Sequence, residues 1–136
     1  MAQYGMVTAQ AAKRVFLLED MPILAKMNCD ILNKNGFTTE TAASSDDAWA
    51  KLNKGSAFDC IILDVMVPGS MSGIELLRKM RADQRFSRAP IVVLTANASP
   101  QIEAQARTAG CDAFFAKPFK VMQLVEVIQA LSHVGD

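Results

Sequence analysis

The stretch Cys60-Ile61-Ile62-Leu63-Asp64 decides the fold, because an apolar run leads directly into a carboxylate. A continuous apolar run of this length is typical of a strand buried on both faces of a parallel sheet. Two other runs have the same form: Val15–Leu18 precedes Glu19-Asp20, and Ala113–Ala116 precedes Lys117-Pro118. Ligands of such sheets bind beyond the carboxyl ends of the strands. We therefore expect three carboxylates and one ammonium group to meet at one sheet edge, where they suit a divalent cation beside a phosphoryl group.

Strand and helix patterns alternate along the rest of the chain. Strands are predicted at residues 14–18, 37–42, 58–64, 91–95 and 113–116. Helices are predicted at residues 22–35, 74–82, 99–110 and 120–132, with one more that Ser45 or Asp46 caps and that ends near Lys54. The inner face of the first helix is expected to carry Ile23, Leu24, Met27, Ile31 and Leu32. Five strands alternating with five helices imply right-handed crossovers and an open, doubly wound parallel sheet of the α/β class.

Length and composition place the chain among single-domain globular proteins. It has 136 residues and a formal net charge of zero, and no basic stripe supports direct binding to nucleic acid. No apolar stretch is long enough to span a membrane. Residues 1–13 are polar and rich in Ala and Gln, so we expect a disordered leader there and a folded domain over residues 14–134. The cysteines lie far apart, which favours single buried thiols in a reducing cytosol over a zinc site: Cys29, Cys60 and Cys111.

The residues at the strand ends favour one chemistry in particular. Asp64 and the pair Glu19-Asp20 would repel each other unless a cation lay between them, and Mg²⁺ prefers such oxygen ligands. Lys117 offers a point charge to a phosphate oxygen, and Thr95, at the end of its own strand, offers a hydroxyl. A carboxylate attacks phosphorus in aspartyl-phosphate enzymes. The pattern therefore indicates phosphoryl transfer to an aspartate, assisted by Mg²⁺.

Nearly the whole chain, from Val15 to Leu131, resembles the receiver domain of two-component response regulators. Four motifs carry the resemblance: Leu18-Glu19-Asp20, Ile62-Leu63-Asp64-Val65-Met66-Val67-Pro68-Gly69, Val93-Leu94-Thr95-Ala96 and Ala116-Lys117-Pro118-Phe119. The resemblance implies a flavodoxin-like sheet with strand order 2-1-3-4-5. It also implies a cytoplasmic, single-domain protein similar to the chemotaxis regulators.

The resemblance also implies which residues bind Mg²⁺ and accept the phosphoryl group. Asp64 would be the phosphoacceptor, and Asp20 and Asp64 would bind the metal directly. The backbone carbonyl of Met66 would be a third ligand, and Glu19 would act through a metal-bound water. Lys117 would assist the transfer, and its peptide bond to the following proline is expected to be cis.

Other residues are implied in phosphoryl binding, switching and hydrolysis. Thr95 and Lys117 would bind the phosphoryl group together with the backbone N–H groups of Met66 and Ala96. Thr95 would also act in the switch with an aromatic residue, here Phe114. Positions two residues beyond the acceptor and the threonine would tune the lifetime of the phosphoryl group: Met66 and Asn97.

The chain departs from the family pattern in three ways. Its last helix has no arginine or lysine after Lys120, where DNA-binding relatives carry paired charges for dimerisation, so that dimer is not expected here; the other two departures lie in a loop and at the switch position. The family's loop after the phosphoacceptor usually runs Pro-x-Met-Asp-Gly, whereas residues 68–73 here read Pro-Gly-Ser-Met-Ser-Gly. This loop is one residue longer and lacks the acid, although it should still turn at Gly73. Phe114 stands where the family often has tyrosine, so it can pack inward or outward but has no hydroxyl to hydrogen-bond.

The leading hypothesis is a phosphorylation switch. It would receive a phosphoryl group from a histidine kinase or histidine phosphotransfer protein and alter its helix 4–strand 5–helix 5 face for a partner that the sequence does not name. Self-phosphorylation from small donors and autodephosphorylation would be its only catalytic activities. The alternatives are a phosphorylation-independent binding module with the same fold, and a receiver fragment of a larger regulator or hybrid kinase.

Two other classes fit the residues less well. A haloacid-dehalogenase-like phosphatase needs a second acid two residues after the nucleophile, where this chain has Met66. A flavodoxin-like cofactor binder needs a loop rich in Ser, Thr and Gly around the flavin phosphate, and no such loop is present.

Overall fold

The chain alternates strands and helices in the predicted order. The structure is a computed structural model and describes residues 13–55 and 57–134. Its elements are β1 (Lys13–Leu18), α2 (Pro22–Lys34), β2 (Phe37–Ala42), α3 (Ser45–Leu52), β3 (Cys60–Asp64), α4 (Gly73–Arg81), the 3₁₀ helix η1 (Gln84–Phe86), β4 (Ile91–Thr95), α5 (Pro100–Ala109), β5 (Ala113–Ala116) and α6 (Val121–Val134). The sequence patterns did not predict η1. The predicted leader, residues 1–13, lies outside the described residues except for Lys13, which begins β1.

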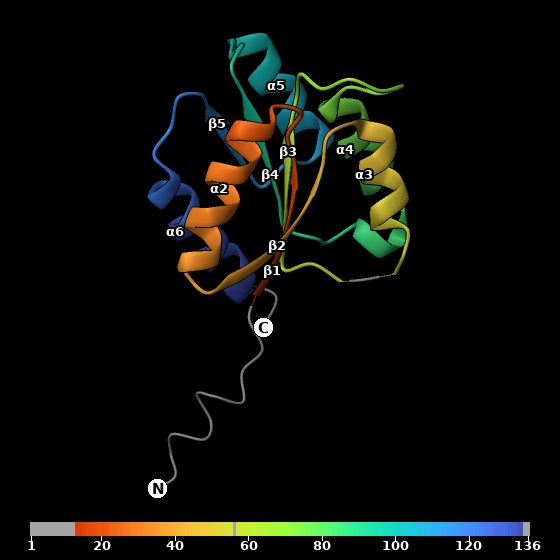
Figure 1. The fold of residues 1–136 in the computed structure, drawn as a ribbon. Helices are drawn as coiled ribbons and strands as arrows, with labels where there is room; N and C mark the ends of the chain where they lie inside the picture. The colour runs from red at the N-terminus through yellow and green to blue at the C-terminus, as the bar shows by residue number, and fades with distance from the viewer. Residues whose placement is uncertain (1–12, 56, 135–136) are drawn as a thin grey trace, which may run out of the picture.

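The five strands form one parallel sheet in the order β2-β1-β3-β4-β5, which confirms the predicted α/β class and strand order (Figure 1). At the carboxyl edge, Leu18 of β1 pairs with Leu63 of β3, and Asp64 pairs with Leu94 of β4. Thr95 ends β4 beside the end of β5. This register brings the polar residues that follow the strands to one edge of the sheet.

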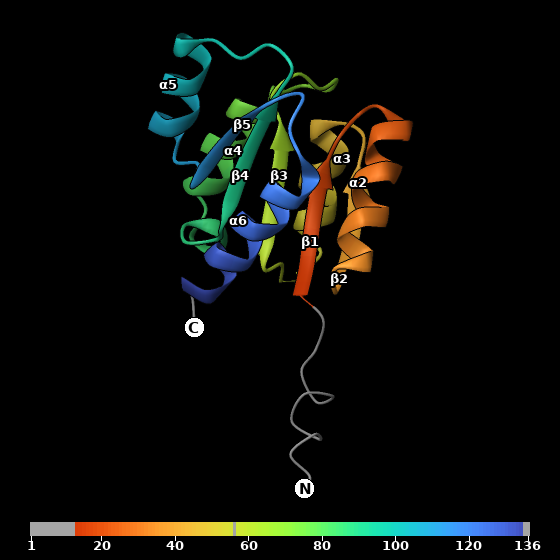
Figure 2. The ribbon, with the colours of Figure 1, turned by 90° about the vertical axis from the view of Figure 1, so that its left-hand side faces the viewer.

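Helices cover both faces of the sheet. Figures 1 and 2 show α2 and α6 on one face and α3, α4 and α5 on the other. Successive strand residues point to opposite faces. Along β1, Phe16 and Leu18 pack with the side of α3, α4 and α5, whereas Val15 and Leu17 pack with the side of α2 and α6. Residues 15–18 of β1 must therefore all be apolar, which is why this part of the strand is a continuous hydrophobic run.

Two local predictions were wrong. The cap of α3 is Ser44, whose side chain accepts a hydrogen bond from the Asp47 N–H, and not Ser45 or Asp46. Ser44 is the N-cap because the helix begins one residue earlier than expected. The side chains of the next two residues are therefore available for other contacts. The remaining differences lie at element ends, where β3 begins at Cys60 rather than at residue 58, α3 ends at Leu52 and α4 begins at Gly73.

The inner face of α2 also differs from the prediction. Leu32 is fully buried, but Ile23 and Met27 are 74% and 53% exposed. The buried stripe runs through Asn28 and Leu32, four residues apart, so at about 100° per residue positions 27 and 23 are turned about 120° and 160° away from its centre. The helix therefore presents apolar side chains to solvent at its N-terminal half.

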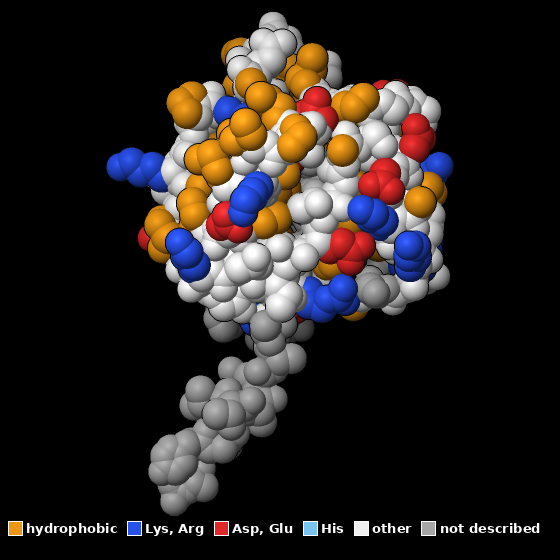
Figure 3. Space-filling model, viewed as in Figure 1, with side chains coloured by type: hydrophobic (Ala, Val, Ile, Leu, Met, Phe, Trp, Pro, Cys, Tyr) orange, Lys and Arg blue, Asp and Glu red, His pale blue; other side chains and the backbone are white. Residues whose placement is uncertain are grey.

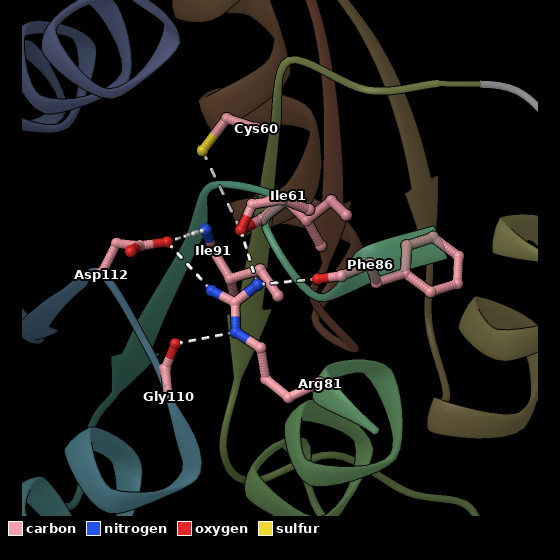
Figure 4. Close-up of polar contacts among 8 residues, drawn as sticks. Cys60, Ile61, Arg81, Phe86, Ile91, Gly110 and Asp112 are labelled. Atoms are coloured by element: carbon pink, nitrogen blue, oxygen red, sulfur yellow. Dashed lines mark hydrogen bonds and ion pairs between the residues drawn. The ribbon is translucent and has the colours of Figure 1, made fainter. Parts of the chain in front are cut away.

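At the opposite edge of the sheet, the guanidinium of Arg81 joins four segments (Figure 4). Its Nε donates to the Gly110 carbonyl at 2.9 Å, and its Nη1 donates to the carbonyls of Phe86 and Ala89 at 2.8 and 2.7 Å. Its Nη2 lies 3.0 Å from Oδ2 of Asp112. Arg81 thus holds the end of α4 to η1, to the segment leading into β4 and to the turn between α5 and β5.

The cysteines of the described chain are free, but only Cys60 is fully buried. Cys29 and Cys111 are half-buried, so the prediction of buried thiols holds for one of the three. Burial at the start of β3 raises the pKa of Cys60 to about 12, and the negative charge of Asp112 adds to this effect. Its thiol is therefore protonated at neutral pH and unreactive.

Candidate active site

Three carboxylates converge at the carboxyl edge of the sheet. Glu19 and Asp20 follow β1 directly, and Asp64 is the last residue of the neighbouring strand β3. One oxygen from each carboxylate lies within 4.8 Å of the other two. Glu19 and Asp64 are only 2% and 4% exposed, so their charges are poorly hydrated. Such a cluster needs positive charge close by.

Lys117 supplies positive charge from the end of β5. Its Nζ lies 2.6 Å from Oε1 of Glu19 and 2.6 Å from Oδ2 of Asp64. Burial by itself lowers the pKa of Lys117, but the hydrogen bonds to Asp64 and Glu19 outweigh burial and raise it. The side chain is therefore an ammonium at neutral pH. The peptide bond between Lys117 and Pro118 is cis, as predicted.

Backbone N–H groups orient two of the carboxylates. The Met66 N–H donates to Oδ1 of Asp64 at 3.1 Å, and the Met21 N–H donates to Oε2 of Glu19 at 3.2 Å. Each of these carboxylates therefore has one oxygen on Lys117 and the other on the backbone. The Met66 side chain itself is 59% exposed.

Thr95 occupies the same edge, but its hydroxyl contacts its own loop. The side chain is fully buried, and Oγ1 accepts a hydrogen bond from the Asn97 N–H at 3.0 Å. The Thr95 carbonyl accepts from the Lys117 N–H at 2.8 Å, which ties the ends of β4 and β5 together. Ala96 and Asn97 follow in an exposed segment.

Phe114 lies farther from the carboxylates. It is the second residue of β5, pairs with Val93 and is half-buried against the core on the side of α3, α4 and α5. The structure thus places Glu19, Asp20, Asp64 and Lys117 in one group, with Thr95 at the neighbouring strand end and Phe114 behind it.

The donor set suits a hard divalent cation. All three acids offer carboxylate oxygens, the ligand type that Mg²⁺ prefers. Three carboxylates beside one ammonium group leave two negative charges, which a divalent ion balances. The half-buried Asp20 leaves the cluster open to water on one side, as Mg²⁺ also requires because it keeps several waters.

The predicted turn at Gly73 shapes the loop after Asp64, together with two residues whose contacts the sequence analysis missed, Ser45 and Asp46. Gly73 begins α4 with its N–H 3.0 Å from the Val65 carbonyl, and a side chain on it would overlap the Asp64 carbonyl. Before Gly73, in the middle of the loop, Ser45 and Asp46 at the start of α3 accept hydrogen bonds from backbone N–H groups of the loop. The only sequence signal for these two was the run of four consecutive capping residue types at positions 44–47.

The family model for the response regulator receiver domain matches residues 15–129. The chain belongs to this family. It is 32% identical over 120 residues to the phosphate regulon transcriptional regulatory protein PhoB of Escherichia coli, which covers 88% of this chain and 52% of PhoB. The chain therefore spans about half the length of that relative. It is 29% identical over 124 residues to the polar-differentiation response regulator DivK of Brucella ovis, which covers 91% of this chain and 98% of DivK.

Solved structures of receiver domains match the fold. The chemotaxis protein CheY4 of Vibrio cholerae has a TM-score of 0.81 and 30% identity, covering 89% of this chain and 99% of its own. The receiver domain of a sensor histidine kinase from Pseudomonas aeruginosa has a TM-score of 0.81 and 28% identity, covering 90% and 99%. A magnesium ion is coordinated in the active site cleft of the latter.

Membership of the family establishes the general function. The chain is a receiver domain of two-component response regulators, as predicted. Receiver domains are in general phosphorylated by histidine kinases or phosphotransfer proteins, and they bind Mg²⁺ in an acidic active site. Over the residues that the structure describes, no helix combines the length and apolar character needed to cross a bilayer.

Proposed function

We propose that this receiver domain is a cytoplasmic phosphorylation switch that carries the phosphoryl group on Asp64. The observation that supports this most strongly is the contact of 2.6 Å between Lys117 Nζ and Asp64 Oδ2. It places a cation against the carboxylate that ends a fully buried strand. Asp64 is fixed by the sheet, whereas Asp20 lies beyond its strand end and Glu19 is held by Lys117 and by the Met21 N–H.

In the proposed reaction, one carboxylate oxygen of Asp64 attacks the phosphorus of the donor, and the donor group leaves with the electrons of the broken bond. A bound Mg²⁺ ion would neutralise charge on the phosphoryl oxygens, held by Asp20, Asp64 and the Met66 carbonyl, with Glu19 acting through water. Lys117 stays with the acceptor and pairs with a phosphoryl oxygen. The N–H of Met66 already donates to Asp64 and is ready to donate to the new group.

The proposed response runs through Thr95. Its hydroxyl and the Ala96 N–H would bind the phosphoryl group, and the hydroxyl, whose oxygen now accepts from the Asn97 N–H, would turn to donate its proton. Phe114 would then move into the space that the hydroxyl leaves, and the face formed by α5, β5 and α6 would change. A partner that binds this face would read the phosphorylation state.

The surface beside the site fits a protein as phosphoryl donor. Hydrophobic side chains gather around the upper end of α2 in Figure 3. The N-terminal half of α2 and the residue before it carry exposed apolar side chains: Met21 and Met27 are 54% and 53% exposed, and Ile23 is 74% exposed. Met66 adds a further exposed apolar side chain next to Asp64. These residues support a histidine kinase or histidine phosphotransfer protein as the partner that docks over the site.

The experiment is incubation with Mg²⁺ and phosphoramidate or acetyl phosphate, followed by intact mass spectrometry. The parent protein should gain one phosphoryl group, and Asp64→Asn should gain none. Asp30→Asn is the matched control, because Asp30 is an exposed carboxylate of α2 paired with Lys26. An adduct that persists in Asp64→Asn would assign the phosphoryl group to another residue. A parent protein that takes up no phosphoryl group from either donor would instead favour a phosphorylation-independent binding module.

A further inference from the structure

The loop between β3 and α4, residues 65–72, is fixed to the site at both ends. At its start, the Val65 N–H donates to the Leu94 carbonyl, and the Met66 N–H donates to Asp64. At its end, the Gly73 N–H returns to the Val65 carbonyl at 3.0 Å. The middle of the loop must therefore project from the sheet, and Figures 1 and 2 show it extending over the upper end of α3.

Two residues in the first turn of α3 hold this middle part. The Ser45 N–H donates to the Pro68 carbonyl at 3.0 Å, and Ser45 Oγ accepts from the Met71 N–H at 3.1 Å. Asp46 receives two more hydrogen bonds from Ser70: Oδ2 from the N–H at 2.9 Å and Oδ1 from the hydroxyl at 2.5 Å. We call these four hydrogen bonds the loop clamp.

Burial and backbone conformation show that the loop and the start of α3 fit closely together at the loop clamp. The Ser45 side chain is fully buried, although serine is mostly found exposed. Gly69 has φ +119°, and any side chain on it would overlap Ser45 Oγ. The two hydrogen bonds from Ser70 also lower the pKa of Asp46, so its carboxylate is charged and both bonds are charge-assisted. The extra residue of this loop is therefore taken up in an ordered contact.

We propose that Ser45 and Asp46 are positioning residues for the active site, which act by fixing the loop that carries Met66. This inference rests on the proposed function, in which the backbone of Met66 binds Mg²⁺ and the phosphoryl group. Neither Ser45 nor Asp46 belongs to the acidic cluster. Their effect reaches the site through the backbone from Met66 to Pro68, in the way that outer partners of metal ligands fix the ligands themselves.

The test is a graded series of variants. Asp46→Ala removes both hydrogen bonds to Ser70, and Ser70→Ala removes only the one from the hydroxyl. Asp46→Asn should restore function, because its amide oxygen can accept from the Ser70 N–H while its amide nitrogen donates to the Ser70 hydroxyl. Asp47→Ala is the matched control, since Asp47 is an exposed acid in the same helical turn and pairs with Lys51 instead.

The readouts are Mg²⁺ affinity by titration calorimetry, hydrogen exchange of the Ser70 and Met71 amides, and the free energy of unfolding. We expect Asp46→Ala to weaken Mg²⁺ binding by roughly three- to tenfold, at or below the usual effect of removing an outer partner. Ser70→Ala should fall between Asp46→Ala and the parent protein. Exchange at the two amides should quicken in Asp46→Ala, whereas Asp46→Asn and Asp47→Ala should behave like the parent.

The outcomes separate this inference from the proposed function. If the parent protein binds Mg²⁺ and is phosphorylated, but Asp46→Ala and Asp47→Ala have equal Mg²⁺ affinities, the loop clamp is only structural and the inference is wrong. The same holds if Asp46→Ala loses affinity only in proportion to its loss of stability, or if Asp46→Asn fails to restore it. A parent protein that neither binds Mg²⁺ nor accepts a phosphoryl group would overturn the proposed function itself.

Discussion

The ammonium group of Lys117 lies 2.6 Å from the Asp64 carboxylate and holds that carboxylate in a site where it is 4% exposed. Lys117→Met should leave Asp64 and Glu19 buried without a cation. In metal-free buffer we expect the free energy of unfolding to fall by about 3 kcal/mol, the usual result of removing one partner of a buried ion pair. Adding Mg²⁺ should stabilise this variant more than the parent, because the metal replaces the missing positive charge.

Chemical denaturation in EDTA and in Mg²⁺ measures both effects. Lys120→Met is the control, because Lys120 is exposed and follows the same strand. Equal stabilisation of the parent and Lys117→Met by Mg²⁺ would contradict the replacement of the lysine charge by the metal, and stabilisation of neither would contradict a cation site at this cluster.

The lifetime of the phosphoryl group should depend on Met66 and Asn97. Both are exposed beside the ends of β3 and β4, where water would approach phosphorylated Asp64. The Met66 side chain is apolar and cannot orient a water molecule, and the Asn97 side chain carries no charge. We expect an intermediate to long lifetime, which Met66→Asn and Asn97→Glu shift severalfold. Loss of the phosphoprotein followed by intact mass spectrometry gives the rates, and rates that neither substitution changes would mean that water reaches the group elsewhere.

Switching should depend on the Thr95 hydroxyl. Its oxygen accepts a hydrogen bond from the Asn97 N–H, and in the proposed switch the hydroxyl turns and donates its proton to the phosphoryl group, a charge-assisted bond worth about 1.5–3 kcal/mol. Thr95→Ala should still accept the group on Asp64 but transmit the change poorly. Amide chemical shifts with and without beryllofluoride test this, and in the parent they should reach Phe114 and α5. Shifts confined to the surroundings of Asp64 would make the chain a phosphoryl carrier or sink.

Stability should fall in alkaline solution because of Cys60. Its pKa is about 12 in the folded chain and 9.0 ordinarily, so between these values the unfolded chain loses the proton first. The thiol's contribution is complete below pH 9 and is lost as pH rises toward 12, with a slope of about 1.4 kcal/mol per pH unit. Denaturation of Cys60→Ala should show a shallower decline than the parent over this range, and Cys29→Ala should not. Parallel curves for the parent and Cys60→Ala would mean that other groups set the decline.

The sequence was sufficient for the sheet and for the grouping at its edge. Strands buried on both faces have unbroken apolar sequences, and parallel strands bring their carboxyl ends together. The sequence therefore predicted that Glu19, Asp64 and Lys117 lie at one edge of the sheet. The geometry of Thr95 and its hydrogen bond to the Asn97 N–H depend on the local turn, which the sequence pattern does not specify.

The errors have physical causes as well. Ser44 and its three successors are all residue types that cap helices, so the sequence alone could not say which one does. In α2, apolar residues lie on two sides of the helix, and the buried side includes the polar Asn28. The loop clamp joins residues 23 to 26 positions apart, mostly through hydrogen bonds to a loop backbone, and local patterns carry no signal for such contacts.

The contact of Arg81 with the Gly110 carbonyl has a mechanical consequence for signalling. Gly110 caps α5, so this helix is fastened at its C-terminal end, while its N-terminal end follows the exposed segment after Thr95. If the proposed switch displaces this segment, we expect α5 to turn about its fastened C-terminal end instead of sliding along the sheet. Displacement is then largest near Pro100 and smallest near Ala109. A partner that binds the N-terminal end of α5 would therefore distinguish the phosphorylated from the unphosphorylated chain best.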